Sequence, residues 1–220
     1  MTFSLVGMCH RTGMFGAAVT TSNMNVGTRC PFAKASIGAV LTQHRTDNRL
    51  GPKGLELLEE GKTAPEVIDS LASDNPTMGW RQLAVIDQSG NSAFYHGDRI
   101  ASTHAAAQGA SSCAIGNIIR TEAVPQAMID AFEEAPSFHL AERLRQFFQL
   151  GLLVLPRGNN LRRLAVHFGG EPFSFLRVRD FHPPEAAKQS AQLVLPARFC
   201  WEFLPDRAEF GRRSPVSPWG

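Results

Sequence analysis

The sequence predicts an α+β fold in which β-sheets pack against each other and helices lie outside them. Three observations predict this class. Strand-like segments fall into two groups along the chain, a pair of helical patterns follows each group, and the strands do not alternate one by one with helices as in a parallel α/β sheet. The 220 residues, 43% hydrophobic and 19% charged, suffice for one substantial core.

The first group of strands begins with a hairpin. Residues 3–8 alternate loosely, residues 10–13 (His-Arg-Thr-Gly) have a turn pattern, and residues 15–21 are small and β-branched. Small residues at 16–18 indicate a strand that another layer approaches closely. Residues 36–42 predict a third strand.

Two helices follow this group. Residues 50–58 carry leucines at helical spacing, and Gly61 ends the helix. The next helix opens with Thr63 and Glu66 at capping-box spacing, with a proline in the first turn. It ends before Pro76, because the residue before a proline disfavours helical backbone.

The second group repeats this order. Residues 82–86 predict a buried strand, residues 87–91 carry strong turn residues, and residues 93–96 return along the first strand. Residues 112–115 predict one more short strand. Helical patterns then cover residues 124–134 and 139–150.

Composition excludes several classes of function. The net charge of +2 gives no electrostatic case for a nucleic acid or an anionic membrane. No apolar run reaches transmembrane length, and no secretory leader is present. The four cysteines (Cys9, Cys30, Cys113 and Cys200) lack zinc-ligand spacing and predict reduced thiols. We therefore expect a cytoplasmic protein without a metal or cofactor.

The last 70 residues differ in character. Residues 151–220 hold eight of the 14 prolines, with ten basic against six acidic side chains. We interpret residues 1–150 as the core of the domain and residues 151–220 as its continuation, partly diverged or shifted in reading frame. Within this tail, residues 173–179 still have the pattern of an edge strand.

The second residue carries chemistry of its own. Cells usually remove the initiator Met when a small residue follows, which would make Thr2 the first residue. A terminal threonine combines a nucleophilic hydroxyl with a base, its α-amine, whose pKa is about 8. This pair suffices to cleave an amide. The alternative is an ordinary start to a strand.

A set of short segments resembles one bacterial protein family, in order and at that family's spacing. They are residues 2–6, 15–19, 26–27, 38–43, 50–55, 81–87 and 116–119. Together they are similar to the family known as domain of unknown function 1028, over residues 1 to about 145. Beyond that point, residues 173–180 resemble its late strand.

The resemblance implies a fold and a site. The family looks like a member of the N-terminal nucleophile (Ntn) hydrolase superfamily, whose fold is a four-layer αββα sandwich, and the predicted order of elements agrees with it. In active members a terminal Thr, Ser or Cys attacks an amide carbonyl and the α-amine relays the proton. Backbone N–H groups or an Asn stabilise the oxyanion. Thr2 falls on the nucleophile position.

Four further residues are candidates for this chemistry. Ser22 and Asn23 end the second strand beside the expected place of Thr2, where either could orient the amine or donate to the oxyanion; a plain turn is the alternative. Lys34 is placed where it could act as the base-assisting lysine of proteasome-like relatives. Asn117 is a candidate second oxyanion donor, and its alternative is a turn residue.

Gln43 and His44 are candidates for substrate binding. They stand at the end of the third predicted strand and precede Arg45. Polar side chains at a strand end line either a cleft or a solvated loop. His96 and His104 have no partner at metal-ligand spacing and are expected on the surface or in the core.

Two functions stay open. The first is an amidohydrolase in which Thr2 attacks a small amide or a peptide without a metal, nucleotide or other cofactor. The second is a non-catalytic binding or assembly protein that keeps the fold; the printed chain, which begins at Met1 and so leaves Thr2 without a free amine, favours it. Sheet-on-sheet folds of this kind often assemble, so we expect a homo-oligomer.

Overall fold

The computed structural model describes residues 1–23, 25–73, 75–153, 164–168 and 174–176. All of them belong to the first of two compact units, which spans residues 1–179. They form helices and two antiparallel sheets, so the predicted α+β class is confirmed. No helix among these residues is both long and apolar enough to cross a membrane.

One sheet has six strands in the order β10-β9-β2-β1-β8-β7. Its centre is the predicted hairpin, whose register pairs Thr2 with Thr21 and Cys9 with Met14. Strand β8 pairs with the other side of β1 and places Asn117 opposite Thr2. The strands are β1 (Thr2–Cys9), β2 (Met14–Thr21), β7 (His104–Gln108), β8 (Ser112–Asn117), β9 (Leu164–Phe168) and β10 (Ser174–Leu176).

The other sheet has four strands in the order β3-β4-β5-β6. In its register Gln43 pairs with Gln82, and Gln82 pairs with His96. Three polar residues thus stand side by side at one end of this sheet. The strands are β3 (Pro31–Lys34), β4 (Gly38–Gln43), β5 (Gln82–Ile86) and β6 (Ser92–His96).

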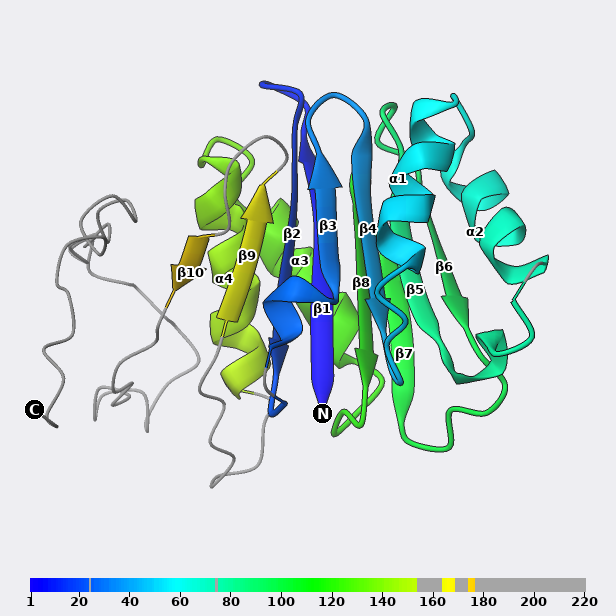
Figure 1. Cartoon of the computed structure of the whole chain (residues 1–220). Helices are drawn as coiled ribbons and strands as arrows, with labels where there is room; N and C mark the ends of the chain where they lie inside the picture. Colours follow the sequence, from blue (N-terminus) through cyan, green and yellow to red (C-terminus); the bar gives the residue numbers. More distant parts are fainter. Residues whose placement is uncertain (24, 74, 154–163, 169–173, 177–220) are drawn as a thin grey trace, which may run out of the picture. The chain divides into compact units, whose positions relative to one another are not determined.

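Each sheet has its own pair of helices. Figure 1 shows α1 (Leu50–Glu59) and α2 (Ala64–Ser73) beside the four-stranded sheet, and α3 (Val124–Glu133) and α4 (Leu140–Leu153) beside the six-stranded one. The predicted capping box is confirmed at α2, where the Thr63 N–H donates to Glu66 Oε2 at 2.8 Å.

The alternation of β1 divides its side chains between two cores. Phe3 and Leu5 pack among residues of α3 and α4, whereas Val6 and Met8 pack among residues of the four-stranded sheet. Because successive strand residues point to opposite faces, Thr2 and Ser4 share the face that looks toward the other sheet. A third buried cluster lies between that sheet and helices α1 and α2.

Strands β3 and β7 were not predicted, and β4 begins later than expected. β3 has four residues and ends in a lysine, and the core of β7 is three alanines, so neither has strong strand propensity. Residues 35–37 are the turn between β3 and β4, with Ser36 at φ 61°, so the strand expected from residue 36 starts at Gly38.

Part of the predicted edge strand at 173–179 is present as β10. Strand β9, which lies between β10 and β2, was not predicted, although its sequence Leu-Ala-Val-His-Phe is strand-like. The remaining residues of the segment 151–220, beyond α4 and these two strands, lie outside the described residues.

Candidate functional site

Polar residues from six strands meet at one end of the two sheets. In the six-stranded sheet, Thr2 stands between Thr21 on β2 and Asn117 on β8, its partners in the two ladders. Opposing residues of antiparallel strands point to the same face. All three side chains therefore face the four-stranded sheet, at the end where Figure 1 marks the N-terminus.

The hydroxyl of Thr2 is held by a short hydrogen-bond chain. Thr2 Oγ1 lies 2.9 Å from Thr21 Oγ1, and Thr21 Oγ1 lies 3.0 Å from the Met1 carbonyl oxygen. A carbonyl only accepts, so Thr21 donates its one hydrogen to Met1 and Thr2 donates to Thr21. The N–H of Asn23 also donates to Thr21 Oγ1, at 3.2 Å. The Thr21 hydroxyl is thereby saturated while Met1 is present.

A row of buried side chains crosses from this face to the four-stranded sheet. Ser4 Oγ donates to Gln43 Oε1 at 2.7 Å, and Gln43 Nε2 donates to Gln82 Oε1 at 2.6 Å. Ser4 and Gln82 are fully buried and Gln43 is 1% exposed. We call Ser4, Gln43, Gln82 and Asn117 the amide row, because three of its four members are side-chain amides.

Gln82 is the centre of the amide row. Its Oε1 also accepts from Asn117 Nδ2 at 3.0 Å, while its Nε2 lies 2.9 Å from the Gly116 carbonyl oxygen and 3.1 Å from His96 Nε2. The Gly116 oxygen can only accept, so it fixes which end of the Gln82 amide is the nitrogen. Every other bond in the row then has one allowed direction.

His96 lies beside the amide row and accepts a hydrogen bond from Gln82. Because Gln82 Nε2 is a donor, His96 Nε2 carries no proton and the ring is neutral. Burial, and secondarily the charge of His104, lowers the pKa of His96 from 6.5 to about 4, which agrees with this assignment. The two histidine rings meet edge-on, with centroids 5.0 Å apart.

The predicted site residues divide into those near Thr2 and those elsewhere. Ser22 and Asn23 are exposed beside Thr2, and the Ser22 N–H donates to the Met1 carbonyl at 3.4 Å. Asn117 is the last residue of β8 and is 2% exposed, so the turn alternative is wrong. Lys34 is not brought to Thr2: it is exposed and pairs with Glu59 of α1 at 2.5 Å.

The two predicted substrate-binding residues differ in burial. Gln43 belongs to the buried amide row, so the alternative that it lies in a solvated loop is wrong. His44 is half-buried just beyond it, with Nδ1 2.8 Å from the Trp80 carbonyl oxygen. That carbonyl only accepts, so Nδ1 carries the proton.

Sequence reasoning missed Thr21, Ser4, Gln82 and His96 as members of this site. The hairpin register places Thr21 opposite Thr2, and counting outward from the turn at residues 10–13 would have found it. Gln82 gave no such signal, because its partners lie 14 to 39 residues away in the chain.

Other reactive groups do not join the site. Burial raises the pKa of the Cys30 and Cys113 thiols to about 12, so both stay protonated at neutral pH. Cys9 stands at the opposite end of β1 from Thr2. Among the described residues, no group of three or more His, Cys, Asp or Glu side chains has a metal-binding arrangement.

The fold and the polar end of its sheets define an α+β protein with two antiparallel sheets and a cluster of polar residues around Thr2. The family model described as "Family of unknown function (DUF1028)" matches residues 2–153, so this chain belongs to that family. It is also similar to the crystal structure of protein SPO2555 from Silicibacter pomeroyi, which matches the same family model.

The likeness to SPO2555 has a TM-score of 0.71 at 26% sequence identity, and covers 83% of this chain and 82% of that one. No curated protein matches this chain.

Proposed function

We propose that the protein is an Ntn-type amidohydrolase with a four-layer αββα sandwich, in which Thr2 is the nucleophile. The observation that carries the proposal is the place of the Thr2 hydroxyl. It lies on a central strand, on the face between the sheets, hydrogen-bonded to Thr21 and directly opposite Asn117. The three buried clusters, one between the sheets and one under each helix pair, support the layer order.

The reaction begins after removal of Met1, which frees the Thr2 α-amine. This amine takes the proton of Oγ1 as Oγ1 bonds to the carbonyl carbon of the substrate amide. Collapse of the tetrahedral intermediate breaks the C–N bond, and the proton leaves with ammonia or an amine. Water then hydrolyses the resulting ester, which releases the acid and restores the threonine hydroxyl.

The surroundings of the chain end favour a neutral amine. Burial lowers the pKa of the Met1 α-ammonium below its ordinary value of 8.0. The α-nitrogen of Thr2 lies one residue further into the sheet, so we expect the same direction for it in the processed chain. Loss of Met1 also removes the acceptor of the Thr21 hydroxyl, which is then available to Thr2.

Asn117 is the proposed oxyanion donor. Its Nδ2 carries two hydrogens, and one of them is used by Gln82. The second is available to the carbonyl oxygen of a substrate held at Thr2. The amide row fixes the orientation of Asn117 before the substrate arrives, as a preorganised oxyanion donor requires. Loss of Met1 also frees the Ser22 backbone N–H at the same edge, whereas the Asn23 N–H stays bonded to Thr21 Oγ1.

The test begins with the mass of the chain purified without an N-terminal tag. We expect a chain that starts at Thr2 and releases ammonia or an amine from members of a panel of small amides and dipeptides. Thr2→Ala is expected to abolish turnover and Thr2→Ser to retain part of it. Thr21→Val, which removes the hydroxyl that is hydrogen-bonded to Thr2 Oγ1, is expected to lower kcat about 10²-fold with little effect on KM.

Two outcomes would contradict the proposal. A chain that keeps Met1 has its α-nitrogen locked in a peptide bond, and the binding or assembly function would then take its place. Turnover that survives in Thr2→Ala would place the chemistry on another residue. Circular dichroism of each variant shows whether the fold is kept. The homo-oligomer stays a prediction, and light scattering on the same preparation would measure the oligomeric state.

A further inference from the structure

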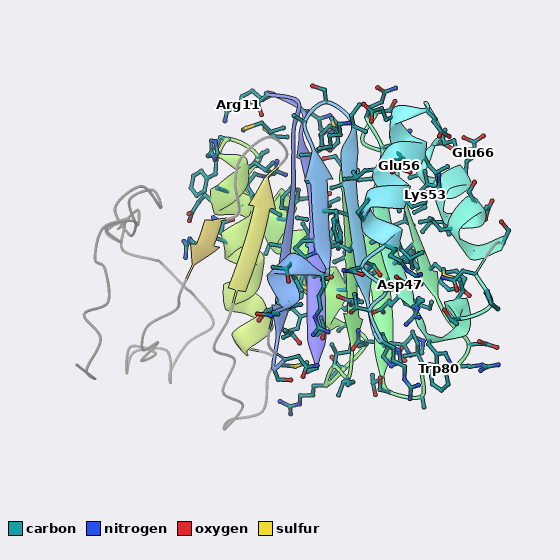
Figure 2. The ribbon with its side chains drawn as sticks, viewed as in Figure 1. Arg11, Asp47, Lys53, Glu56, Glu66 and Trp80 are labelled. Atoms are coloured by element: carbon teal, nitrogen blue, oxygen red, sulfur yellow. The ribbon has the colours of Figure 1, made fainter. Side chains whose placement is uncertain are left out.

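A cluster of positive side chains surrounds one tryptophan at the end of the sheets that carries the amide row. The guanidinium carbon of Arg45 lies 4.0 Å from the centroid of the Trp80 ring, and that of Arg99 lies 5.6 Å from it. Both arginines are exposed. Figure 2 shows Trp80 at the end of the ribbon opposite Arg11. We call Arg45, Trp80 and Arg99 the arginine–tryptophan cluster.

The strand register explains why these residues meet. Gln43, Gln82 and His96 are neighbours across β4, β5 and β6. Arg45 follows Gln43 by two residues, Trp80 precedes Gln82 by two, and Arg99 follows His96 by three. The loops that leave three paired positions of a sheet at the same end must lie side by side.

Backbone contacts hold two of these loops together. The N–H of Arg99 donates to the Gly79 carbonyl at 2.8 Å, and the N–H of Gly97 donates to the Arg81 carbonyl at 2.9 Å. A Cβ on Gly97 would lie 2.2 Å from the Gly79 oxygen, so only glycine permits this approach. Arg99 is thereby fixed next to the loop that carries Trp80.

The third loop is held by a strained turn. His44 and Arg45 both adopt left-handed backbone, with φ of 56° and 49°. Consecutive non-glycine residues in this region are uncommon and persist where the surroundings fix them. Here His44 donates to the Trp80 carbonyl at 2.8 Å, and the Arg45 side chain stacks on the ring of the same residue.

The two cluster arginines outnumber the one carboxylate beside them, that of Asp98, whose Oδ1 would lie 2.5 Å from a Cβ on Gly79. The ion pairs among the described residues involve other side chains. Arg81, next to Trp80, donates from Nη2 to Thr77 Oγ1 at 3.0 Å and its charge acts on the Asp47 carboxylate, while its Nε is buried with no hydrogen-bond partner among the described residues. A guanidinium that stacks by its face keeps its N–H edge free for the two oxygens of a carboxylate or phosphate.

We propose that the arginine–tryptophan cluster is a binding site for the oxyanion group, carboxylate or phosphate, of a small molecule. Arg45 and Arg99 supply the donors, and Trp80 holds both guanidinium groups in place. The site requires neither a free Thr2 amine nor catalysis. The cluster lies at the same end of the sheets as Thr2. An oxyanion group bound there would therefore anchor a substrate near Thr2.

The test is a titration of the full chain, followed by Trp fluorescence, with inorganic phosphate, succinate and chloride at constant ionic strength. We expect saturable binding of phosphate or succinate, and the comparison of the two identifies the preferred oxyanion. Arg45→Ala and Arg99→Ala are each expected to weaken binding about tenfold. The matched control is Arg11→Ala, which removes an equal charge at the opposite end and should bind as the wild type does.

Specific outcomes would overturn the proposal. It is overturned if neither anion shows saturation beyond chloride, or if the double Arg45→Ala, Arg99→Ala variant binds as tightly as the wild type. If that variant misfolds, the double Arg45→Lys, Arg99→Lys variant serves instead. It keeps both charges but lacks the paired N–H donors of a guanidinium, so it should fold normally and bind weakly. Equal affinity of the Lys variant and the wild type would also overturn it. Thr2→Ala should bind normally, which separates this site from the proposed catalysis.

Discussion

Three backbone carbonyls determine the hydrogen-bond directions of the site. The Met1 oxygen orients the Thr21 hydroxyl, the Gly116 oxygen orients the Gln82 amide, and the Trp80 oxygen selects the tautomer of His44. A carbonyl never donates, so each side chain that meets one has a single assignment. Two of these orientations survive removal of Met1, whereas that of Thr21 changes.

His96 makes stability depend on pH. Its pKa is 6.5 in the unfolded chain and about 4 in the fold, so the unfolded chain takes up the proton first as the solution becomes acidic. The His96 contribution to the free energy of unfolding is therefore complete above pH 6.5 and is lost as the pH falls toward 4. Below pH 4 both states are protonated, and the loss stops.

The measurement is the melting temperature against pH for the wild type and His96→Gln. We expect the variant to lose less stability than the wild type between pH 6.5 and 4. His10→Gln, an exposed histidine in the turn at the other end of β1, is the matched control and should keep the wild-type slope. Equal slopes in all three proteins would refute the assignment of a neutral His96.

At the scale of elements, the Gln82 side chain of β5 forms hydrogen bonds to residues of both sheets. Replacing Gln82 with Leu would leave Gln43 Nε2, Asn117 Nδ2 and the Gly116 oxygen without their partner. An unsatisfied buried polar group costs about 1–3 kcal/mol, so we expect the free energy of unfolding to fall by at least about 3 kcal/mol. Urea denaturation measures this.

The control for that change is Gln88→Leu, an exposed glutamine in the turn that follows β5. It makes the same substitution outside the core and is expected to change the free energy of unfolding by less than about 0.5 kcal/mol. A Gln82 variant as stable as this control would mean that the amide row contributes no stability.

The elements that the sequence predicted well are those with local signals. The hairpin and the capped helix α2 depend on residues within a few positions of each other, such as Thr63 and Glu66. Strands β3 and β7 lack such signals and form because a neighbouring strand pairs with them. In the same way Thr2 became a candidate through its own chemistry, whereas Gln82 owes its place in the amide row to distant partners.

At the scale of the whole molecule, β9 covers the outer edge of β2. The pairing runs from Gly16 with Phe168 to Thr20 with Leu164. A chain that ends at residue 153 would expose this edge, and unpaired edge strands promote aggregation. A chain that ends at residue 179 keeps β9 and β10 within the first compact unit.

We therefore expect the two truncated chains to behave differently. The 1–179 chain should elute as one species and melt within about 2 °C of the full chain. The 1–153 chain should aggregate with increasing concentration or lose its cooperative transition. Size-exclusion chromatography with light scattering measures both. A well-behaved 1–153 chain would show that β9 is dispensable.

The position of Thr2 in the middle of a sheet has a consequence for the gene. The ladders of β2 and β8 hold the start of the chain on both sides, so any added leader would have to emerge from between them. Under the proposed mechanism, the second codon sets both whether the initiator is trimmed and which atom reacts. A single base change there would act on maturation and on chemistry at once, and a fusion partner is best placed at the carboxyl end.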